Sequence, residues 1–158
     1  MARLLILGGG CRGRRLAAEV IGAGHAVRIV TRSAERRVEI EALGAECFLG
    51  DPNRLGTLRG ALESVTVVCW LLGDARGEPR QLRELHESRL PAFLAQAVDS
   101  PLRGFVYEAA VDDAGAEGAR LVRGVAARNA IAATALTADR RDTDLWLKAA
   151  RATLSPFL

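Results

Sequence analysis

The stretch that decides the fold is Met1-Ala2-Arg3-Leu4-Leu5-Ile6-Leu7-Gly8-Gly9-Gly10-Cys11-Arg12-Gly13-Arg14-Arg15. Its unbroken apolar run at residues 4–7 is typical of a strand that is buried on both faces. Three glycines follow with the spacing G-x-G-x-x-G, at Gly8, Gly10 and Gly13, and a helical pattern continues over residues 16–23. The stretch therefore predicts a buried strand, a tight glycine turn and a helix, in that order.

The three glycines fit a site for a pyrophosphate group. Gly8 permits the tight turn, Gly10 lets the backbone approach the anion, and Gly13 lets the helix lie close to the strand. The free N–H groups and the positive end of the helix then face the anion. The same spacing occurs in purely structural turns, but its place between a first strand and a helix favours dinucleotide binding.

Four larger side chains lie between or directly after the glycines of this loop. Arg14 and Arg15 stand where a P-loop needs a lysine and a hydroxyl residue, so a P-loop is excluded. Cys11 and Arg12 lie inside the loop, and Arg12 adds a positive charge near the expected anion. If these two side chains occlude the pyrophosphate, the fold would remain while the nucleotide site has decayed. That reading stays open as an alternative.

Length and composition describe an ordinary globular protein. The 158 residues, 49% of them apolar and 26% charged, predict one domain over residues 1–158. The net charge is +3, but the basic residues are scattered among 19 acids without interleaved aromatics, so no nucleic-acid partner is expected. The sequence contains neither an apolar run of membrane-spanning length nor a secretory signal, which predicts a cytoplasmic protein without a membrane span.

The three cysteines show no C-x-x-C spacing. Cys47 and Cys69 lie in apolar, strand-like runs and are predicted to be buried thiols, whereas Cys11 in the glycine loop could be exposed. No metal site is predicted.

Strand-like and helical segments alternate along the whole chain. After the first strand, strands are predicted at residues 25–32, 45–49, 65–72, 103–110 and 130–137. Helices are predicted at residues 16–23, 34–43, 54–62, 81–98, 120–129 and from 142 or 143 to 154. This alternation predicts the α/β class, with a single doubly wound parallel sheet of about six strands in the order 3-2-1-4-5-6 and helices on both faces. His25 is expected to be structural and His86 to be exposed.

The residues at the end of the second predicted strand, Thr31 and Arg32, indicate whether the cofactor is NAD or NADP. A free ribose 2′-hydroxyl prefers an acid at this position, whereas a 2′-phosphate needs a cation. Arg32 supplies that cation, and Arg36 and Arg37 follow one turn later, so NADP is favoured over NAD. The alternative is that these are solvated arginines at the start of a helix. The missing acid also argues against an S-adenosylmethionine methyltransferase.

Two further residues are candidates for nucleotide contacts. Asp51, after the third predicted strand, either accepts a hydrogen bond from the adenine amine or caps the helix expected at residues 54–62, and both readings stay open. Gly73 ends the fourth predicted strand, which places it beside the ribose and pyrophosphate.

Four motifs together resemble an NAD(P)-binding Rossmann-fold family, the atypical short-chain dehydrogenases and reductases of the NmrA-like and NAD-dependent epimerase-like type. They are the glycine loop at residues 8–13, Gly24-His25-Ala26-Val27 leading to Thr31-Arg32, Gly50-Asp51, and Gly104-Phe105-Val106-Tyr107. The resemblance implies a Rossmann domain with a nicotinamide dinucleotide as cofactor.

The catalytic residues of that family are missing from this sequence. Catalytic members carry Tyr-x-x-x-Lys, but Tyr107 is followed four residues later by Val111, and the only lysine is Lys148. The Ser or Thr that the family often has at the end of the fifth strand is replaced by Glu108-Ala109-Ala110. A non-catalytic, NADP(H)-binding or redox-sensing module is therefore the favoured hypothesis.

The alternative is a small NADPH-dependent oxidoreductase, with Tyr107 or Glu108 as proton partners at the end of the fifth strand. For Glu108 a surface carboxylate is the preferred interpretation, and for Tyr107 core packing. The substrate is not predicted. A homodimer would be indicated if the helix at residues 81–98 or 120–129 exposed an apolar face.

Overall fold

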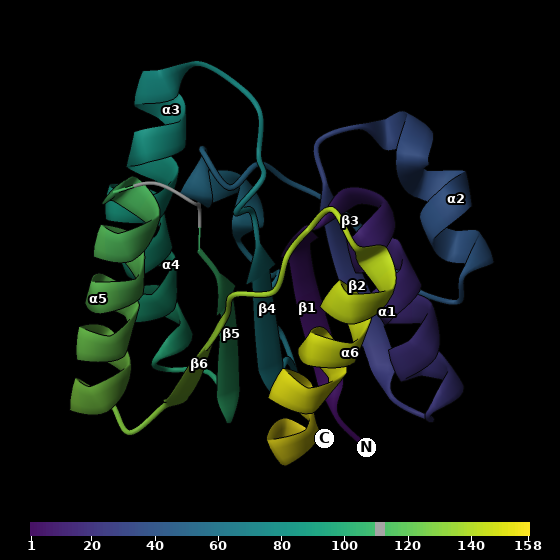
Figure 1. The fold of residues 1–158 in the computed structure, drawn as a ribbon. Coiled ribbons are helices and arrows are strands. Elements are labelled where there is room, and N and C mark those ends of the chain that lie inside the picture. The colour runs from purple at the N-terminus through teal and green to yellow at the C-terminus, as the bar shows by residue number, and fades with distance from the viewer. Residues whose placement is uncertain (110–112) are drawn as a thin grey trace.

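In the computed structural model, which describes residues 1–109 and 113–158 without the side chains of residues 113 and 114, the strands form one six-stranded sheet. The strand order is β3-β2-β1-β4-β5-β6, and all neighbouring strands are parallel (Figure 1). The strands are β1 (Arg3–Gly8), β2 (Ala26–Thr31), β3 (Glu46–Leu49), β4 (Val67–Leu71), β5 (Gly104–Glu108) and β6 (Ala132–Leu136). The order confirms the predicted doubly wound sheet.

Helices cover both faces of this sheet. The first group, α1 (Gly10–Gly22), α2 (Arg37–Ala42) and α6 (Thr143–Leu154), packs on one face. The second group, α3 (Pro79–Glu84), η3 (Leu85–Arg89), α4 (Leu90–Ala97) and α5 (Asp113–Arg128), covers the other face (Figure 1). Short 3-10 helices form within the described residues at η1 (Ala34–Arg36), η2 (Leu55–Leu58) and η4 (Ser155–Phe157).

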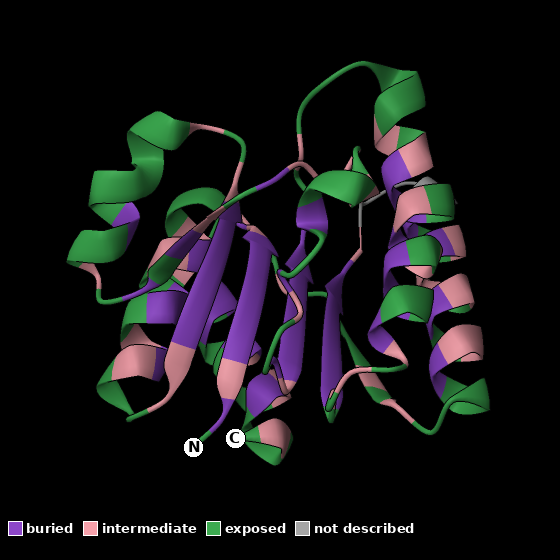
Figure 2. Cartoon of the chain, turned by 180° about the vertical axis from the view of Figure 1, so that it is seen from behind, coloured by how far each residue is buried: buried purple, intermediate pink, exposed green. Residues whose placement is uncertain are grey.

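The core lies in two apolar layers, one on each side of the sheet. Residues of β1 alternate between them, since Leu4 and Ile6 pack with α1 and α6 whereas Leu5 and Leu7 pack with α4. Figure 2 shows the central strands buried along most of their length. The apolar run at residues 4–7 is therefore buried on both faces, as its sequence predicts.

The helix predicted at residues 54–62 is wrong. Only η2 forms there, followed by turns. Gly60 adopts a φ of +84°, which an α-helix does not allow, and the Thr57 hydroxyl donates to the Arg54 carbonyl over 2.7 Å. This segment is held instead by Arg28 of β2, whose Nη1 donates to the Ala61 carbonyl over 2.6 Å.

The expected exposure of His86 is also wrong, because this side chain is only 3% exposed. The helix predicted at residues 81–98 contains a π-helical turn at η3, and the extra residue turns His86 toward the sheet together with Leu85. His86 Nδ1 is hydrogen-bonded to the Tyr107 hydroxyl over 3.0 Å. His25 is structural, as expected, since its Nδ1 accepts the Ala2 N–H over 3.1 Å.

Several boundaries differ from the sequence prediction. β5 ends at Glu108, and α5 begins at Asp113, seven residues earlier than expected. Ala110 and Val111 lie outside the described residues. The last helix starts where predicted, because Asp142 Oδ1 accepts the Leu145 N–H over 3.0 Å as its N-cap.

The surface of the described residues carries few large apolar side chains. The exposed ones are Met1, Val38, Leu49, Leu145 and Leu158, and none of them lies on α3, α4 or α5. The helices that would have indicated a homodimer thus expose no large apolar side chain in this part of the chain. Every helix within it is too short or too polar to cross a membrane.

Candidate functional site

The glycine loop connects β1 to α1 through three left-handed residues. Gly8, Gly9 and Gly10 have φ values of +81°, +81° and +52°. A Cβ on Gly13 would lie 2.6 Å from the Gly8 carbonyl oxygen, so only glycine allows this approach of helix to strand. A Cβ on Gly10 would meet open space. The loop therefore keeps its backbone accessible at Gly10, next to the positive end of α1.

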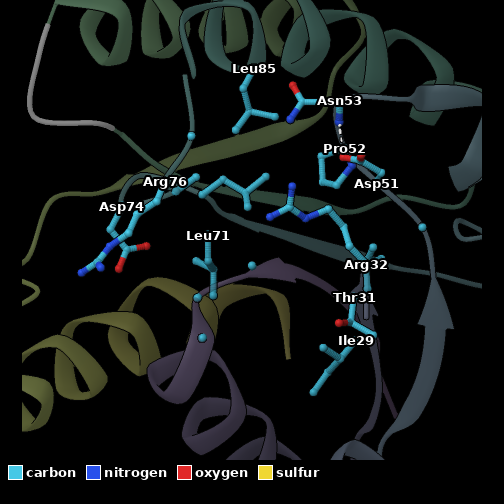
Figure 3. A pocket seen from close by; sticks show the side chains of 18 of the residues that line it. Ile29, Thr31, Arg32, Asp51, Pro52, Asn53, Leu71, Asp74, Arg76 and Leu85 are labelled. Carbon is cyan, nitrogen blue, oxygen red and sulfur yellow. Dashed lines mark hydrogen bonds between the residues drawn. The ribbon is translucent and has the colours of Figure 1, made fainter. Parts of the chain in front are cut away.

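A cavity of about 300 Å³ opens beside this loop, at the carboxyl ends of β1, β2, β3 and β4 (Figure 3). The segment that follows β4 covers it from the other side, through Asp74–Gly77 and the first residues of α3. The predicted site residues that line it are Gly8, Gly10, Thr31, Arg32 and Asp51. Ligands of open α/β sheets bind in this type of crevice, where the strand order reverses.

Arginines give the cavity a positive wall. Arg14 and Arg36 line it, and both pair with Glu39, over 3.1 and 3.2 Å. Arg32 reaches from the end of β2 into the cavity (Figure 3), and it pairs with no carboxylate in the described part of the chain. Arg37 does not line the cavity and pairs with Glu41 over 3.2 Å. Arg32 therefore offers its guanidinium to a bound anion.

Asp51 lines the cavity after β3, next to the end of β2, since the Gly50 N–H donates to the Thr31 carbonyl over 3.0 Å. Its Oδ1 accepts the Asn53 N–H over 2.9 Å, and its own N–H donates to the Thr57 hydroxyl over 2.7 Å (Figure 3 shows the first of these bonds). The helix that Asp51 was to cap does not form, so the capping interpretation is wrong. Its role toward adenine remains a prediction.

The cavity lining does not include Cys11, Arg12, Gly13 or Gly73, the other predicted contacts. Cys11 is exposed on α1, and Gly13 lies beneath the loop. The Arg12 guanidinium does not line the cavity, but its Nη2 donates to Oδ2 of the lining residue Asp74 over 2.7 Å. A Cβ on Gly73 would overlap the guanidinium of Arg140, which the sequence analysis did not select.

The two residues at the end of β5 point to opposite faces of the sheet. Tyr107 packs in the α4 layer, as expected, and its hydroxyl donates to the Gly115 carbonyl over 3.2 Å. Glu108 is 1% exposed, so the surface-carboxylate interpretation is wrong. Its Oε2 accepts Trp146 Nε1–H over 2.7 Å and lies 3.5 Å from Arg140 Nε. The cavity lining includes neither residue.

The strand order, the glycine loop and the crevice at the carboxyl edge define a Rossmann fold. No protein-family model matches the sequence, and no curated protein matches it either.

Solved structures share this fold. One is a short-chain dehydrogenase/reductase superfamily protein from Agrobacterium tumefaciens with bound NAD, with a TM-score of 0.69 at 18% identity over 84% of this chain and 48% of that one. Another is UDP-glucuronic acid 4-epimerase from Bacillus cereus with UDP-glucuronic acid and NAD, with a TM-score of 0.66 at 16% identity over 84% and 55%. A third is vestitone reductase from alfalfa, with a TM-score of 0.65 at 12% identity over 85% of this chain and 56% of that one. The resemblance predicted from the sequence is confirmed at the level of the fold, and this chain spans about half the length of these structures.

Proposed function

We propose that this chain binds NADP(H) in the cavity beside the glycine loop and serves as a cofactor-binding or redox-sensing module. The observation that carries the proposal is Arg32, which reaches into the cavity from the end of β2 with no carboxylate partner among the described residues. A guanidinium at this position matches a ribose 2′-phosphate, and it can form two parallel hydrogen bonds to it.

The other lining residues suit the rest of a 2′-phosphorylated adenosine nucleotide. The open backbone at Gly10 and the positive end of α1 suit the pyrophosphate. Arg14 and Arg36 add positive charge, and Asp51 after β3 would accept a hydrogen bond from the adenine amine. When bound, the cofactor would supply or accept a hydride.

A binding role is favoured over turnover by the residues at the end of β5. Tyr107 and Glu108, the two candidate proton partners, are both 1% exposed and engaged in hydrogen bonds within the protein. The sole lysine, Lys148, is exposed on α6. The three cysteines are free thiols, which is typical of a reducing compartment and supports a cytoplasmic location.

Calorimetric titration with NADPH and NADH tests the proposal. We expect micromolar binding of NADPH that weakens at least roughly tenfold in Arg32→Ala, since a charge-assisted phosphate contact contributes about 1.5–3 kcal/mol. NADH binding should be unaffected by the same change. Arg37→Ala is the matched control, because Arg37 carries the same charge close to Arg32 in the sequence but does not line the cavity. If neither nucleotide binds at millimolar concentration, the proposal fails and the glycine loop is purely structural.

A further inference from the structure

The cavity covers only half of the carboxyl edge of the sheet. Within the described residues, its walls come from the β1, β2, β3 and β4 ends, from α1 and α2, and from the segment up to η3, with no contribution from β5, β6 or α6. In a sheet of this order a dinucleotide spans both halves, with its second nucleotide over the strands beyond the switch point. The half that the second nucleotide would need is therefore outside the cavity.

Arg140 occupies that second half. It lies on the segment between β6 and α6, and its Nη2 donates to the Ala109 carbonyl directly after β5. Its Nε is 3.5 Å from Glu108 Oε2, and its guanidinium fills the space that a side chain at Gly73, after β4, would need. One guanidinium thus lies across the ends of β4 and β5.

Several contacts hold Arg140 in this position. The Glu108 carboxylate beneath it is buried, and its Oε1 has no hydrogen-bond partner among the described residues. Arg12 Nη1 donates to the Arg140 carbonyl over 3.4 Å, while the Arg12 guanidinium lies 5.3 Å from the centre of the Trp146 ring. Moving Arg140 away would leave a buried carboxylate without its cation, which is strongly unfavourable.

From this arrangement, and resting on the proposed function, we infer that the site recognises the adenosine half alone and leaves the nicotinamide of NADP(H) outside the protein. The ligand class is a 2′-phosphorylated adenosine nucleotide with a 5′-diphosphate, whatever the second group attached to it. The cavity volume of about 300 Å³ agrees with a ligand smaller than a whole dinucleotide, since it lies at the lower end of the range for small-molecule sites.

The test compares two nucleotides on the unmodified protein by calorimetry. One is NADPH, and the other is 2′-phosphoadenosine 5′-diphosphoribose, which keeps the 2′-phosphate and the diphosphate and lacks only the nicotinamide. We expect equal affinities within about threefold and no change in the nicotinamide fluorescence of NADPH on binding. NADPH binding at least about tenfold tighter, with a shifted nicotinamide emission, would overturn the inference but leave the proposed function intact. Absence of binding by both would overturn the proposed function.

A variant pair checks the part that Arg140 plays. The double substitution Glu108→Gln and Arg140→Ala removes both charges of the ion pair together, so that the buried Glu108 carboxylate is not left unpaired. In this protein we expect NADPH to bind at least about threefold more tightly than the diphosphoribose, with altered nicotinamide emission, because the second half is open. Arg141→Ala is the control, since the neighbouring Arg141 side chain is 91% exposed and pairs with Asp139. An unchanged affinity ratio in the double variant would contradict the role given to Arg140.

Discussion

Trp146 Nε1 donates a hydrogen bond to Glu108 Oε2 over 2.7 Å, joining α6 to the end of β5 inside the core. The two residues are 38 positions apart in the sequence, and each is at most 1% exposed. This bond fixes the carboxylate that holds Arg140 across the end of the sheet. It therefore links the stability of the fold to the position of Arg140, outside the cavity.

Trp146→Phe should destabilise the protein more than Trp70→Phe. Both tryptophans are 0% exposed, so both substitutions remove a similar volume from the core. Only Trp146 loses a hydrogen bond, because Trp70 Nε1 has no partner among the described residues. We expect a difference of about 1–3 kcal/mol in the free energy of unfolding, measured by urea denaturation with the remaining tryptophan as the fluorophore. Equal destabilisation would show that the bond to Glu108 contributes nothing.

Gly13→Ala should destabilise the junction between β1 and α1. Its Cβ would lie 2.6 Å from the Gly8 carbonyl oxygen, which forces the helix away from the strand at a cost of about 1–3 kcal/mol. Gly22→Ala, in the same helix, is the control, because a Cβ there meets nothing within 4 Å. That variant should be neutral or stabilised by up to about 1 kcal/mol. Thermal unfolding of both proteins measures the contrast, and similar midpoints would contradict it.

Arg28→Met should loosen the turns that follow β3. Arg28 is 6% exposed, and its Nη1 donates to the carbonyls of Gly60, Ala61 and Glu63. Because these are bonds from a charged donor, we expect a loss of about 1.5–3 kcal/mol and faster proteolysis between residues 54 and 64. Arg3→Met is the control, since Arg3 makes an ion pair with Glu46 while 41% exposed. Cleavage at the same rate in both variants would argue against the assigned role of Arg28.

The cysteines should differ sharply in reactivity. Cys11 is exposed, whereas burial raises the pKa of the Cys69 thiol to about 12. In the native protein at pH 8 a thiol reagent should modify one cysteine, and Cys11→Ser should abolish this labelling. In the denatured protein the reagent should modify all three cysteines. Rapid labelling of Cys69 in the folded protein would contradict its burial.

The same thiol predicts how stability depends on pH. The folded state keeps the Cys69 proton up to about pH 12, but the unfolded chain loses it near pH 9. The unfolded state then binds fewer protons, so the free energy of unfolding falls as pH rises through this window. Cys69→Ala should reduce that decline, as measured by urea unfolding at pH 8 and pH 10.5. An identical decline in both proteins would exclude a contribution from this thiol.

The structural features that the sequence predicts correctly are those that depend on residues close together in the chain. The apolar run of β1 and the glycines after it are local signals, so the strand, the turn and the close approach at Gly13 could be read directly. The position of Arg32 follows from where β2 ends, and the structure places it on the cavity wall.

What the sequence does not predict depends on partners that are distant in the chain. The sequence predicts a surface position for Glu108, but α6 packs Trp146 against it. It predicts exposure for His86, but a π-helical turn directs this side chain toward the sheet. Arg12 is predicted from the sequence to contact the nucleotide, but it does not line the cavity, and its guanidinium pairs with Asp74, which is 62 residues away. No local pattern marks Arg140, since its position depends on how the segment after β6 returns to the sheet.

On the inference above, the ion pair between Arg140 and Glu108 affects every ligand that must place a group over the ends of β4 and β5. Such a ligand binds only the fraction of molecules in which Arg140 has moved aside, and its apparent dissociation constant rises by the inverse of that fraction. Each 1.4 kcal/mol needed for opening therefore weakens its binding about tenfold, while a ligand confined to the first half is not affected. If the inference holds, the pair would discriminate between ligands by whether they need the second half of the edge, through an equilibrium that exists in the free protein.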